Sequence, residues 1–336
     1  MKRVVGTFAA LLLIAAALVA AGCGGGDNTS STATSTGSQA SGGNVDLTQG
    51  KDVTIAVITH GGGDTFWAVA KKGAEDAGKD LGVKVNYSES NNDPQKQAQL
   101  IEAAVTQKVD GIATSLPNPD AMAGAIKRAT DAGIPVITLN SGEADSAKLG
   151  AITHVGQSEE VAGEGAGQKL KEAGGKKLIC IIHEQANIGL NQRCDGAKKT
   201  FGNVENVQVK GIDDIQTTLT EIQSKLQSDK SIDSVLALNP DIAIAARDAI
   251  KGASSNAKLA TFDLSGDVIT AIKSGEILFA VDQQQYLQGY LPVVFLTLYK
   301  TNLNTVGGGK PVLTGPGFVT KDNAAQVEKL AEEGTR

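Results

Sequence analysis

The sequence has no basic excess and lacks the short motifs of several common activities. Its 31 lysines and arginines face 37 aspartates and glutamates, a balance that argues against nucleic acid as a partner. The three histidines form no i, i+4 pair on a predicted helix, so a hydrogen-bonding role is a better interpretation than a zinc site. No glycine-rich segment fits the dinucleotide-binding or Walker pattern. We therefore expect no nucleic acid, no metal and no cofactor.

A serine hydrolase is also disfavoured. The segment His60-Gly61-Gly62-Gly63 resembles the oxyanion-hole motif of lipases and esterases. That chemistry requires a nucleophilic serine in a Gly-x-Ser-x-Gly elbow, and the nearest approach, at residues 156–160, lacks the second glycine. The chain is therefore predicted not to be an enzyme.

Long hydrophobic runs are absent beyond the N-terminus, and the run found there has the pattern of an export signal. Lys2 and Arg3 precede the apolar segment Phe8–Val19, which is too short to span a bilayer as a stable anchor. The overlapping stretch Leu18–Cys23 resembles the lipobox of bacterial lipoproteins, in which the cysteine is acylated and becomes the first residue. Cys23 is therefore the predicted lipidation site; the alternative is an ordinary secretory signal that is cleaved nearby.

Residues 1–22 are accordingly predicted to be a lipoprotein signal peptide, and residues 23–50 a flexible tether rich in Gly, Ser and Thr. A tether of about 27 residues has a root-mean-square reach of roughly 30 Å. Loss of Lys2 and Arg3 lowers the basic residues from 31 to 29 against 37 acids, a formal charge of 29 − 37 = −8. An acidic surface suits an exported protein that is held to the extracytoplasmic face of the cell membrane only by its lipid.

Cysteine is scarce, with three residues in the chain. Lipidation of Cys23 would leave Cys180 and Cys194 as a pair, and an exported protein can form a disulfide. Cys180 lies on a predicted strand and Cys194 on the next predicted helix, so closure across this unit is plausible. A loop of this size would stabilise the fold by about 3 kcal/mol. The alternative is two buried free thiols, which pack as small apolar side chains.

Strand-like and helix-like segments alternate along the rest of the chain. The predicted strands are Val53–Thr59, Val83–Tyr87, Gly111–Thr114, Pro135–Leu139, Ala151–Val155, Lys177–Ile182, Val207–Lys210, Ser234–Leu238, Leu259–Phe262 and Ile277–Val281. The predicted helices are Phe66–Leu81, Pro94–Gln107, Asp120–Ala132, Ser158–Glu172, Leu190–Phe201, Thr217–Ser228, Ile242–Lys251, Val268–Ser274 and Tyr286–Tyr299.

This alternation predicts an α/β protein built of βαβ units with parallel sheets. The strands are too many for one compact sheet, so we expect two doubly wound, Rossmann-like lobes. The strand- and turn-like tail Pro311–Thr320 is predicted to cross between them for the last time. Pro94 is expected in the first turn of its helix and Ser158 as a plausible N-cap.

The first strand leads into the most informative stretch of the chain. The apolar run from Ile55 ends at His60, and three glycines follow, where a ligand can approach the backbone closely. Asp64 and the aromatic pair Phe66-Trp67 come next, at the start of a helix. Ligands of parallel α/β sheets bind outside the carboxyl ends of the strands. This stretch is therefore predicted to form one wall of a small-molecule cleft.

Several short motifs follow one another along the chain: Asp64-Thr65-Phe66-Trp67, Asn118-Pro119-Asp120, the segment from Ile134 to Asn140, Arg193-Cys194-Asp195-Gly196, Asn239-Pro240-Asp241, Thr261-Phe262-Asp263, the segment from Asp282 to Tyr290, and the segment from Thr314 to Thr320. These motifs resemble those of the type I periplasmic binding proteins, in particular the ribose-binding-like sugar subgroup of ABC importers. Each is weak alone, but their order and spacing are specific, and the resemblance runs from about Val53 to Ala325.

The resemblance implies two lobes joined by three hinge crossings, with a monosaccharide-sized ligand between them. The N-terminal lobe would comprise residues 51–155 and 284–312, and the C-terminal lobe residues 156–283 and 313–330. The family's ligand contacts fall on His60, Asp64, Phe66, Trp67, Ser115, Asn140, Arg193, Asp213, Asn239, Asp263 and Gln283.

The sequence departs from the ribose binders at three of these places. Asn140-Ser141 replaces an aspartate followed by an arginine, His60 replaces a serine, and Asp213 stands where an aromatic is found. The resemblance therefore implies the scaffold but does not imply ribose as the ligand.

The predicted contact residues suit a sugar. Carboxylates accept hydrogen bonds from hydroxyls, a guanidinium donates in a fork, and carboxamides do both. Aromatic rings can lie against the apolar face of a sugar ring.

Each contact residue also has a structural alternative. Asp64 could only cap a helix, the aromatic pair could be core, and Arg193 could be a solvated helix residue. Asp263 could be a turn residue, Asp214 could replace Asp213, and Gln283 could serve the hinge.

We therefore predict a substrate-binding lipoprotein of an ABC transporter that captures a monosaccharide or similar polyol by hinge closure and delivers it to a membrane permease. A monomer is expected. The alternative is a sensor that presents a sugar or furanose-like signal to a chemoreceptor or receptor kinase. A secreted hydrolase is less favoured, and so is a repressor relative, since an export signal replaces the DNA-binding helices.

Overall fold

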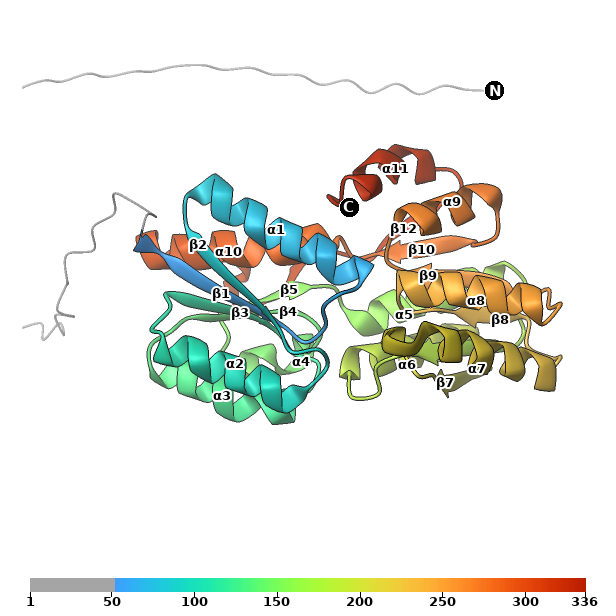
Figure 1. Cartoon of the computed structure of the whole chain (residues 1–336), viewed down its shortest axis with the longest axis horizontal. Coiled ribbons are helices and arrows are strands. Elements are labelled where there is room, and N and C mark those ends of the chain that lie inside the picture. Colours follow the sequence, from blue (N-terminus) through green and yellow to red (C-terminus); the bar gives the residue numbers. More distant parts are fainter. Residues whose placement is uncertain (1–51) are drawn as a thin grey trace, which may run out of the picture. The chain divides into compact units, whose positions relative to one another are not determined.

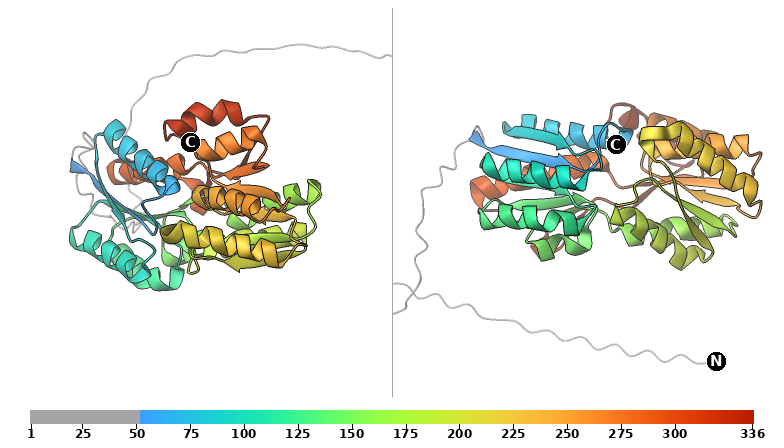
Figure 2. Two further views of the ribbon diagram at one scale, coloured as in Figure 1. Left: turned by 45° about the vertical axis from the view of Figure 1, so that its right-hand side comes forward. Right: turned by 60° about the horizontal axis from the view of Figure 1, so that its bottom comes forward.

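The computed structural model describes residues 52–336, so the predicted signal peptide, tether and Cys23 lie outside the described residues. Two six-stranded sheets organise the described chain, each with helices on both faces (Figures 1 and 2). The prediction of a two-lobed α/β fold is confirmed. None of the described helices has both the length and the apolar character that crossing a membrane requires.

The N-terminal lobe contains the sheet β11-β5-β4-β3-β1-β2, in which every neighbouring pair is parallel. Its strands are β1 (Thr54–Thr59), β2 (Lys84–Glu89), β3 (Gly111–Ser115), β4 (Val136–Asn140), β5 (His154–Gly156) and β11 (Val312–Leu313). Its helices are α1 (Thr65–Leu81), α2 (Pro94–Thr106), α3 (Pro119–Asp131), the short α4 (Glu143–Ser146) and η2 (Ala147–Leu149), and α10 (Gln285–Asn302). Helices α1 and α10 share one hydrophobic core with the sheet, and α2 and α3 share the other.

The C-terminal lobe contains the sheet β12-β10-β9-β8-β6-β7. Its strands are β6 (Leu178–Ile182), β7 (Val204–Gln208), β8 (Ser234–Leu236), β9 (Lys258–Phe262), β10 (Phe279–Asp282) and β12 (Gly317–Thr320). Its helices are α5 (Glu159–Glu172), α6 (Ile188–Phe201), η3 (Ile212–Asp214), α7 (Ile215–Ser228), α8 (Pro240–Gly252), α9 (Gly266–Ser274) and α11 (Ala324–Glu332). Helices α5 and α6 cover one face, and α7, α8, α9 and α11 cover the other.

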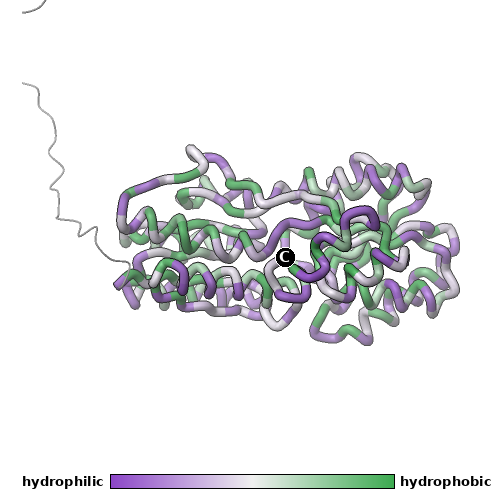
Figure 3. The backbone as a smooth tube through the Cα atoms, turned by 90° about the horizontal axis from the view of Figure 1, so that it is seen from above, coloured by the Kyte–Doolittle hydropathy of each residue, from purple (hydrophilic) through white to green (hydrophobic). Residues whose placement is uncertain are grey.

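Burial on both faces explains why the central strands read as unbroken apolar runs. All five residues of β6, from Leu178 to Ile182, are buried, because helices cover the sheet on each side. The helices instead alternate hydrophobic and hydrophilic residues along the chain, with one side facing a core (Figure 3). A disulfide joins Cys180 of β6 to Cys194 of α6 within the second of these cores.

Several helices begin within a few residues of the end of a strand, after a capping residue. Asn118 and Asn239 cap α3 and α8, and each is followed by a proline in the first helical turn. Asp64 caps α1 by accepting a hydrogen bond from the backbone N–H of Trp67 at 2.8 Å. These caps lie at the carboxyl ends of the strands, so the residues that start the helices also reach the space between the lobes.

The chain passes between the lobes three times: after β5, after β10 and after β11. Hydrogen bonds tie these crossings together. The Thr314 N–H donates to the carbonyl of Gly156 at 2.6 Å, and Nε2 of Gln284 donates to the carbonyl of Thr314 at 2.6 Å. The three connections therefore form one hinge region.

Three local expectations differ from the structure. The seventh strand covers Val204–Gln208 rather than Val207–Lys210, because an edge strand with none of its five residues fully buried has a weak apolar pattern. Strand β12 pairs antiparallel with β10, so the second sheet is mixed. Ser158 occupies the N-cap of α5, but its side chain makes no capping hydrogen bond.

Candidate functional site

A cavity lies where the carboxyl ends of the two sheets face each other. Both lobes contribute its walls. The lining residues are His60, Asp64, Phe66, Trp67 and Asn140 from the first lobe, and His183, Glu184, Asn187, Leu190, Arg193, Leu238, Asn239, Asp263 and Gln283 from the second lobe and its crossing.

Three rings form the aromatic wall. The indole of Trp67 meets the Phe66 ring edge-to-face at 4.8 Å and the His60 ring at 4.9 Å. A Cβ at Gly61 would lie 2.1 Å from Nε1 of Trp67, so only glycine leaves room for the indole at this position. Phe66 and Trp67 are buried in the core as well as lining the cavity, so the packing and cleft roles coexist.

Asp64 links the two lobes across the top of the cavity. Its Oδ1 caps α1, and its Oδ2 accepts a hydrogen bond from Nδ2 of Asn239 at 3.3 Å. Burial raises the pKa of Asp64 to about 7, and the nearby carboxylates of Glu184 and Asp241 add to the rise. Near neutral pH this carboxyl is therefore present in both protonation states.

A second polar group lies toward the hinge. Nε2 of Gln283 donates to Oδ1 of Asp263 at 2.9 Å, and Nδ2 of Asn140 lies 3.3 Å from Oε1 of Gln288. Asn140 and Asp263 both have positive φ, 61° and 67°, which aspartate and asparagine tolerate better than most residues. Burial raises the pKa of Asp263 to about 8, even though the Arg193 charge and the Gln283 hydrogen bond lower it.

Arg193 is buried and makes three hydrogen bonds within its own lobe. Its Nε and Nη2 donate to the two carboxylate oxygens of Glu159 at 2.6 and 2.9 Å, and Nη1 donates to the carbonyl of Leu238 at 3.2 Å. The guanidinium lies 4.5 Å from the centre of the Phe262 ring. Burial alone would lower the pKa of Arg193, but the Glu159 carboxylate more than offsets this, and the net shift is upward. Arg193 is therefore not a solvated helix residue.

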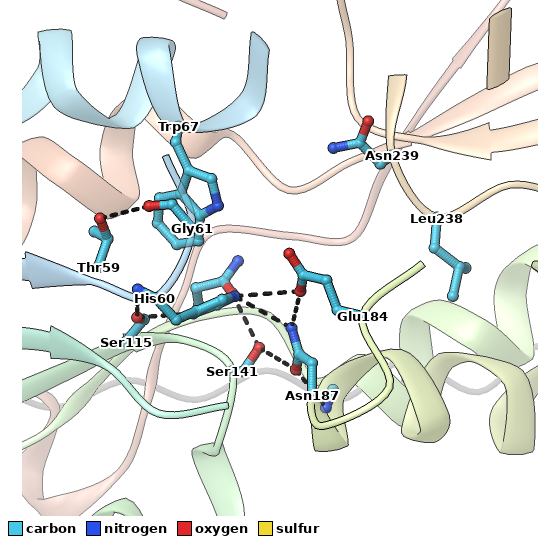
Figure 4. A network of polar contacts seen from close by, with 12 residues as sticks. Thr59, His60, Gly61, Trp67, Ser115, Ser141, Glu184, Asn187, Leu238 and Asn239 are labelled. Atoms are coloured by element: carbon cyan, nitrogen blue, oxygen red, sulfur yellow. Dashed lines mark hydrogen bonds and ion pairs between the residues drawn. The ribbon is translucent and has the colours of Figure 1, made fainter. Parts of the chain in front are cut away.

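Contacts between the lobes close the far side of the cavity (Figure 4). Nδ2 of Asn187 donates to Oε2 of Glu184 at 2.7 Å and lies 3.2 Å from Nε2 of His60. Nε2 of His60 lies 3.4 Å from Oε2 of Glu184. Burial would raise the pKa of Glu184, but the neighbouring His60, His183 and Asn187 hold it well below its usual range.

Comparison with known proteins agrees with this architecture. The family described as periplasmic binding protein domain matches residues 55–301. This chain belongs to that family. The ribose import binding protein RbsB of Haemophilus influenzae is 29% identical over 249 residues, which cover 72% of this chain and 83% of that relative.

Two solved structures of solute-binding proteins share the fold. A carbohydrate transporter of Acidothermus cellulolyticus 11B, in complex with myo-inositol, is 45% identical, with a TM-score of 0.83, and the match covers 85% of this chain and all of that one (100%). An ABC transporter solute-binding protein of Burkholderia graminis C4D1M, in complex with D-arabinose, is 26% identical, with a TM-score of 0.72 and coverage of 82% and 97%.

In this periplasmic binding protein, nine of the eleven residues named from the sequence line the cavity. Ser115 instead lies behind it, fully buried, with its Oγ 2.8 Å from both the backbone N and Nδ1 of His60. Asp213 lines a neighbouring cavity, because it follows the edge strand β7 rather than a central strand.

Five lining residues were not named from the sequence: His183, Glu184, Asn187, Leu190 and Leu238. His183 and Glu184 directly follow β6, and Leu238 lies just beyond β8, so the strand-end rule applied to every strand would have found them. Among residues 52–336, no cluster of three or more His, Cys, Asp or Glu side chains could hold a metal ion.

Proposed function

We propose that this chain is the substrate-binding lipoprotein of an ABC importer and that it captures a neutral, single-ring sugar or cyclic polyol between its lobes. The observation that carries this proposal is the cavity itself, where carboxyl, carboxamide and imidazole groups of both lobes converge beside Trp67.

The electrostatics support a neutral ligand. The Arg193 guanidinium is already paired with Glu159, so it offers no free charge to a ligand carboxylate. The carboxyls of Asp64 and Asp263, with pKa values of about 7 and about 8, can donate as well as accept hydrogen bonds near neutral pH. Sugar hydroxyls are both donors and acceptors and match such groups.

The comparisons favour a cyclic polyol within this class. The relative with 45% identity was solved with myo-inositol, whereas the ribose import relatives are less similar. At Asn140-Ser141 this chain also carries two neutral residues where the ribose-binding pattern has an acid and a base. We therefore propose myo-inositol or a close stereoisomer as the first ligand to test, and no catalytic step.

The mechanism proposed is closure of the lobes around the ligand. Contacts between the lobes already exist outside the cavity: the backbone N–H of Ile188 donates to the carbonyl of Pro117 at 3.0 Å, and Thr65 Oγ1 donates to Oδ1 of Asp241 at 3.0 Å. A ligand that bridges both lobes has higher affinity for this closed arrangement and shifts the population toward it. The closed monomer, anchored through Cys23, would then deliver its cargo to a membrane permease.

Calorimetry and thermal unfolding of the purified protein against pentoses, hexoses, deoxysugars and inositols test the proposal. At a ligand concentration 100-fold above Kd, binding stabilises the native state by about 2.7 kcal/mol, which raises the melting temperature measurably. Failure of every neutral sugar and polyol to bind would refute it. Uptake of the identified ligand by a deletion strain distinguishes an importer from a sensor.

A further inference from the structure

The space between the lobes continues beyond the ligand cavity into a second, larger one. This outer chamber has a volume of about 300 Å³ and is bounded by the start of α2, the start of α3 and the segments that follow β6 and β7. Four residues line both cavities: His60, His183, Glu184 and Asn187. These four side chains therefore stand between the two cavities, and they are called the partition below.

Hydrogen bonds hold the first-lobe side of the partition in place. The Ser115 hydroxyl accepts from the His60 backbone N–H at 2.8 Å and from Nε2 of Gln97 at 3.2 Å. The Ser115 hydroxyl can then donate a hydrogen bond to Nδ1 of His60, 2.8 Å away. In this arrangement Nε2 of His60 carries a hydrogen and directs it at Glu184 of the other lobe.

The second-lobe side is held equally firmly. Oδ1 of Asn187 caps α6 by accepting from the Gly189 N–H at 2.9 Å, and it also accepts from Ser141 Oγ at 3.0 Å. Its Nδ2 is bound to Glu184 at 2.7 Å. Glu184 thus joins His60 to Asn187, and its side chain is the piece of the partition that a passing group would have to displace.

The outer chamber has polar features suited to a second neutral ring. Nε2 of the buried Gln97 donates to the carbonyl of Ser115 at 2.9 Å, which fixes the orientation of the amide. Oε1 of Gln97 has no hydrogen-bond partner within residues 52–336, and Gln97 lines the chamber. Lys210 and Asp213 contribute one charge of each sign, and Glu184 adds a negative one, so a phosphate would meet two carboxylates there.

We propose that the partition is a size filter: it restricts the cargo to a single unsubstituted ring, and without the Glu184 side chain a second sugar ring attached to that cargo would occupy the outer chamber. Glu184 and Asn187 are thereby specificity-determining residues. The inference depends on the proposed capture of a neutral polyol or sugar.

The test compares two ligands by calorimetry: myo-inositol and a galactosylated myo-inositol. For the unaltered protein we expect the Kd of the galactosylated myo-inositol to be at least 100-fold higher than the Kd of myo-inositol. Glu184→Ala should reduce this ratio at least tenfold, whereas the matched control Glu184→Gln, which keeps the size of the side chain, should leave the ratio within about threefold. Adding Lys210→Ala to Glu184→Ala should weaken only the two-ring ligand.

A second variant guards against a Glu184→Ala protein that fails to fold. Asn187→Gly removes the Asn187 side chain from the partition, and glycine is an acceptable helix N-cap. This variant should therefore also lower the ratio of the two Kd values tenfold. Equal binding of both ligands by the unaltered protein would overturn the filter and make the outer chamber a native subsite. An unchanged ratio in folded Glu184→Ala and Asn187→Gly proteins would also overturn it. If neither ring system binds the unaltered protein, the proposed function fails first.

Discussion

Replacement of Glu159 by glutamine should destabilise the protein and change the titration of the cavity. Glu159 and Arg193 are each only 3% exposed and share two hydrogen bonds of 2.6 and 2.9 Å. Glu159→Gln preserves the shape of the side chain but leaves the buried guanidinium charge without its partner. Breaking a buried pair in this way costs roughly 3–5 kcal/mol.

The matched control is the double variant Glu159→Gln with Arg193→Met, in which both charges are gone. Because replacing a buried pair by neutral groups of similar volume is often nearly neutral, the double variant should recover most of the lost stability. The ligand affinity of the double variant should nevertheless be lower than that of the unaltered protein if Arg193 contacts the cargo. Urea unfolding followed by circular dichroism measures the first effect, and calorimetry measures the second.

A further readout is the acid Asp263. Glu159 contributes to the raised pKa of Asp263, and Arg193 lowers it, so Glu159→Gln should lower the pH at which Asp263 loses its proton. The reasoning is wrong if Glu159→Gln unfolds at the same urea concentration as the unaltered protein, or if the double variant is less stable than the single one.

Three other perturbations follow from the structure. The pKa of Asp263 is about 8 in the folded state, above the unfolded value near 3.8, so the folded state binds the extra proton and its stability should fall as pH rises from about 4 to about 8. Asp263→Asn should flatten that fall. An equal loss of stability between pH 5 and pH 8 in both proteins, measured by urea unfolding, would contradict this prediction. Replacing Cys180 and Cys194 together by alanine should cost about 3 kcal/mol in urea unfolding, given the sequence separation of 14; a cost below about 1 kcal/mol would argue against the entropic account. Gly61→Ala should displace the indole of Trp67, the only tryptophan, because the added Cβ would overlap with it. Overpacking of this kind costs about 1–3 kcal/mol of stability. An unchanged fluorescence spectrum and an unchanged ligand affinity would show that the position of the indole does not require glycine at residue 61.

The fold was largely predictable because the periodic signals were strong. Apolar runs such as Leu178–Ile182 are buried on both faces, and proline at the first turn of α2, α3 and α8 marks where helices begin. The boundary errors fall at the edges of the sheet. There, a strand such as β7 has exposed residues and an irregular pattern, and the antiparallel β12 leaves no sign in the sequence of the direction in which it pairs.

The residues that line the cavity were predictable where a position near the carboxyl end of a strand is enough to place a side chain there. Asn140 ends β4, Asp263 directly follows β9, and Asn239 lies three residues beyond β8, all of them central strands. Hydrogen-bond partners were not predictable, because they depend on side chains that lie far apart in the sequence. Ser115 has the right position in the chain, but its hydroxyl is used to hold His60, and Glu159, which holds Arg193, lies outside the cavity lining.

The two sheets have the same strand order, with β4 of one lobe corresponding to β9 of the other. The residues at the ends of these strands, Asn140 and Asp263, occupy the same left-handed backbone conformation and face the same cavity. These two equivalent backbone positions accept few residues besides asparagine, aspartate and glycine without strain. A substitution at either position that alters the cargo is therefore confined to that small set unless the backbone is strained, and each lobe can accept it without a change in the other.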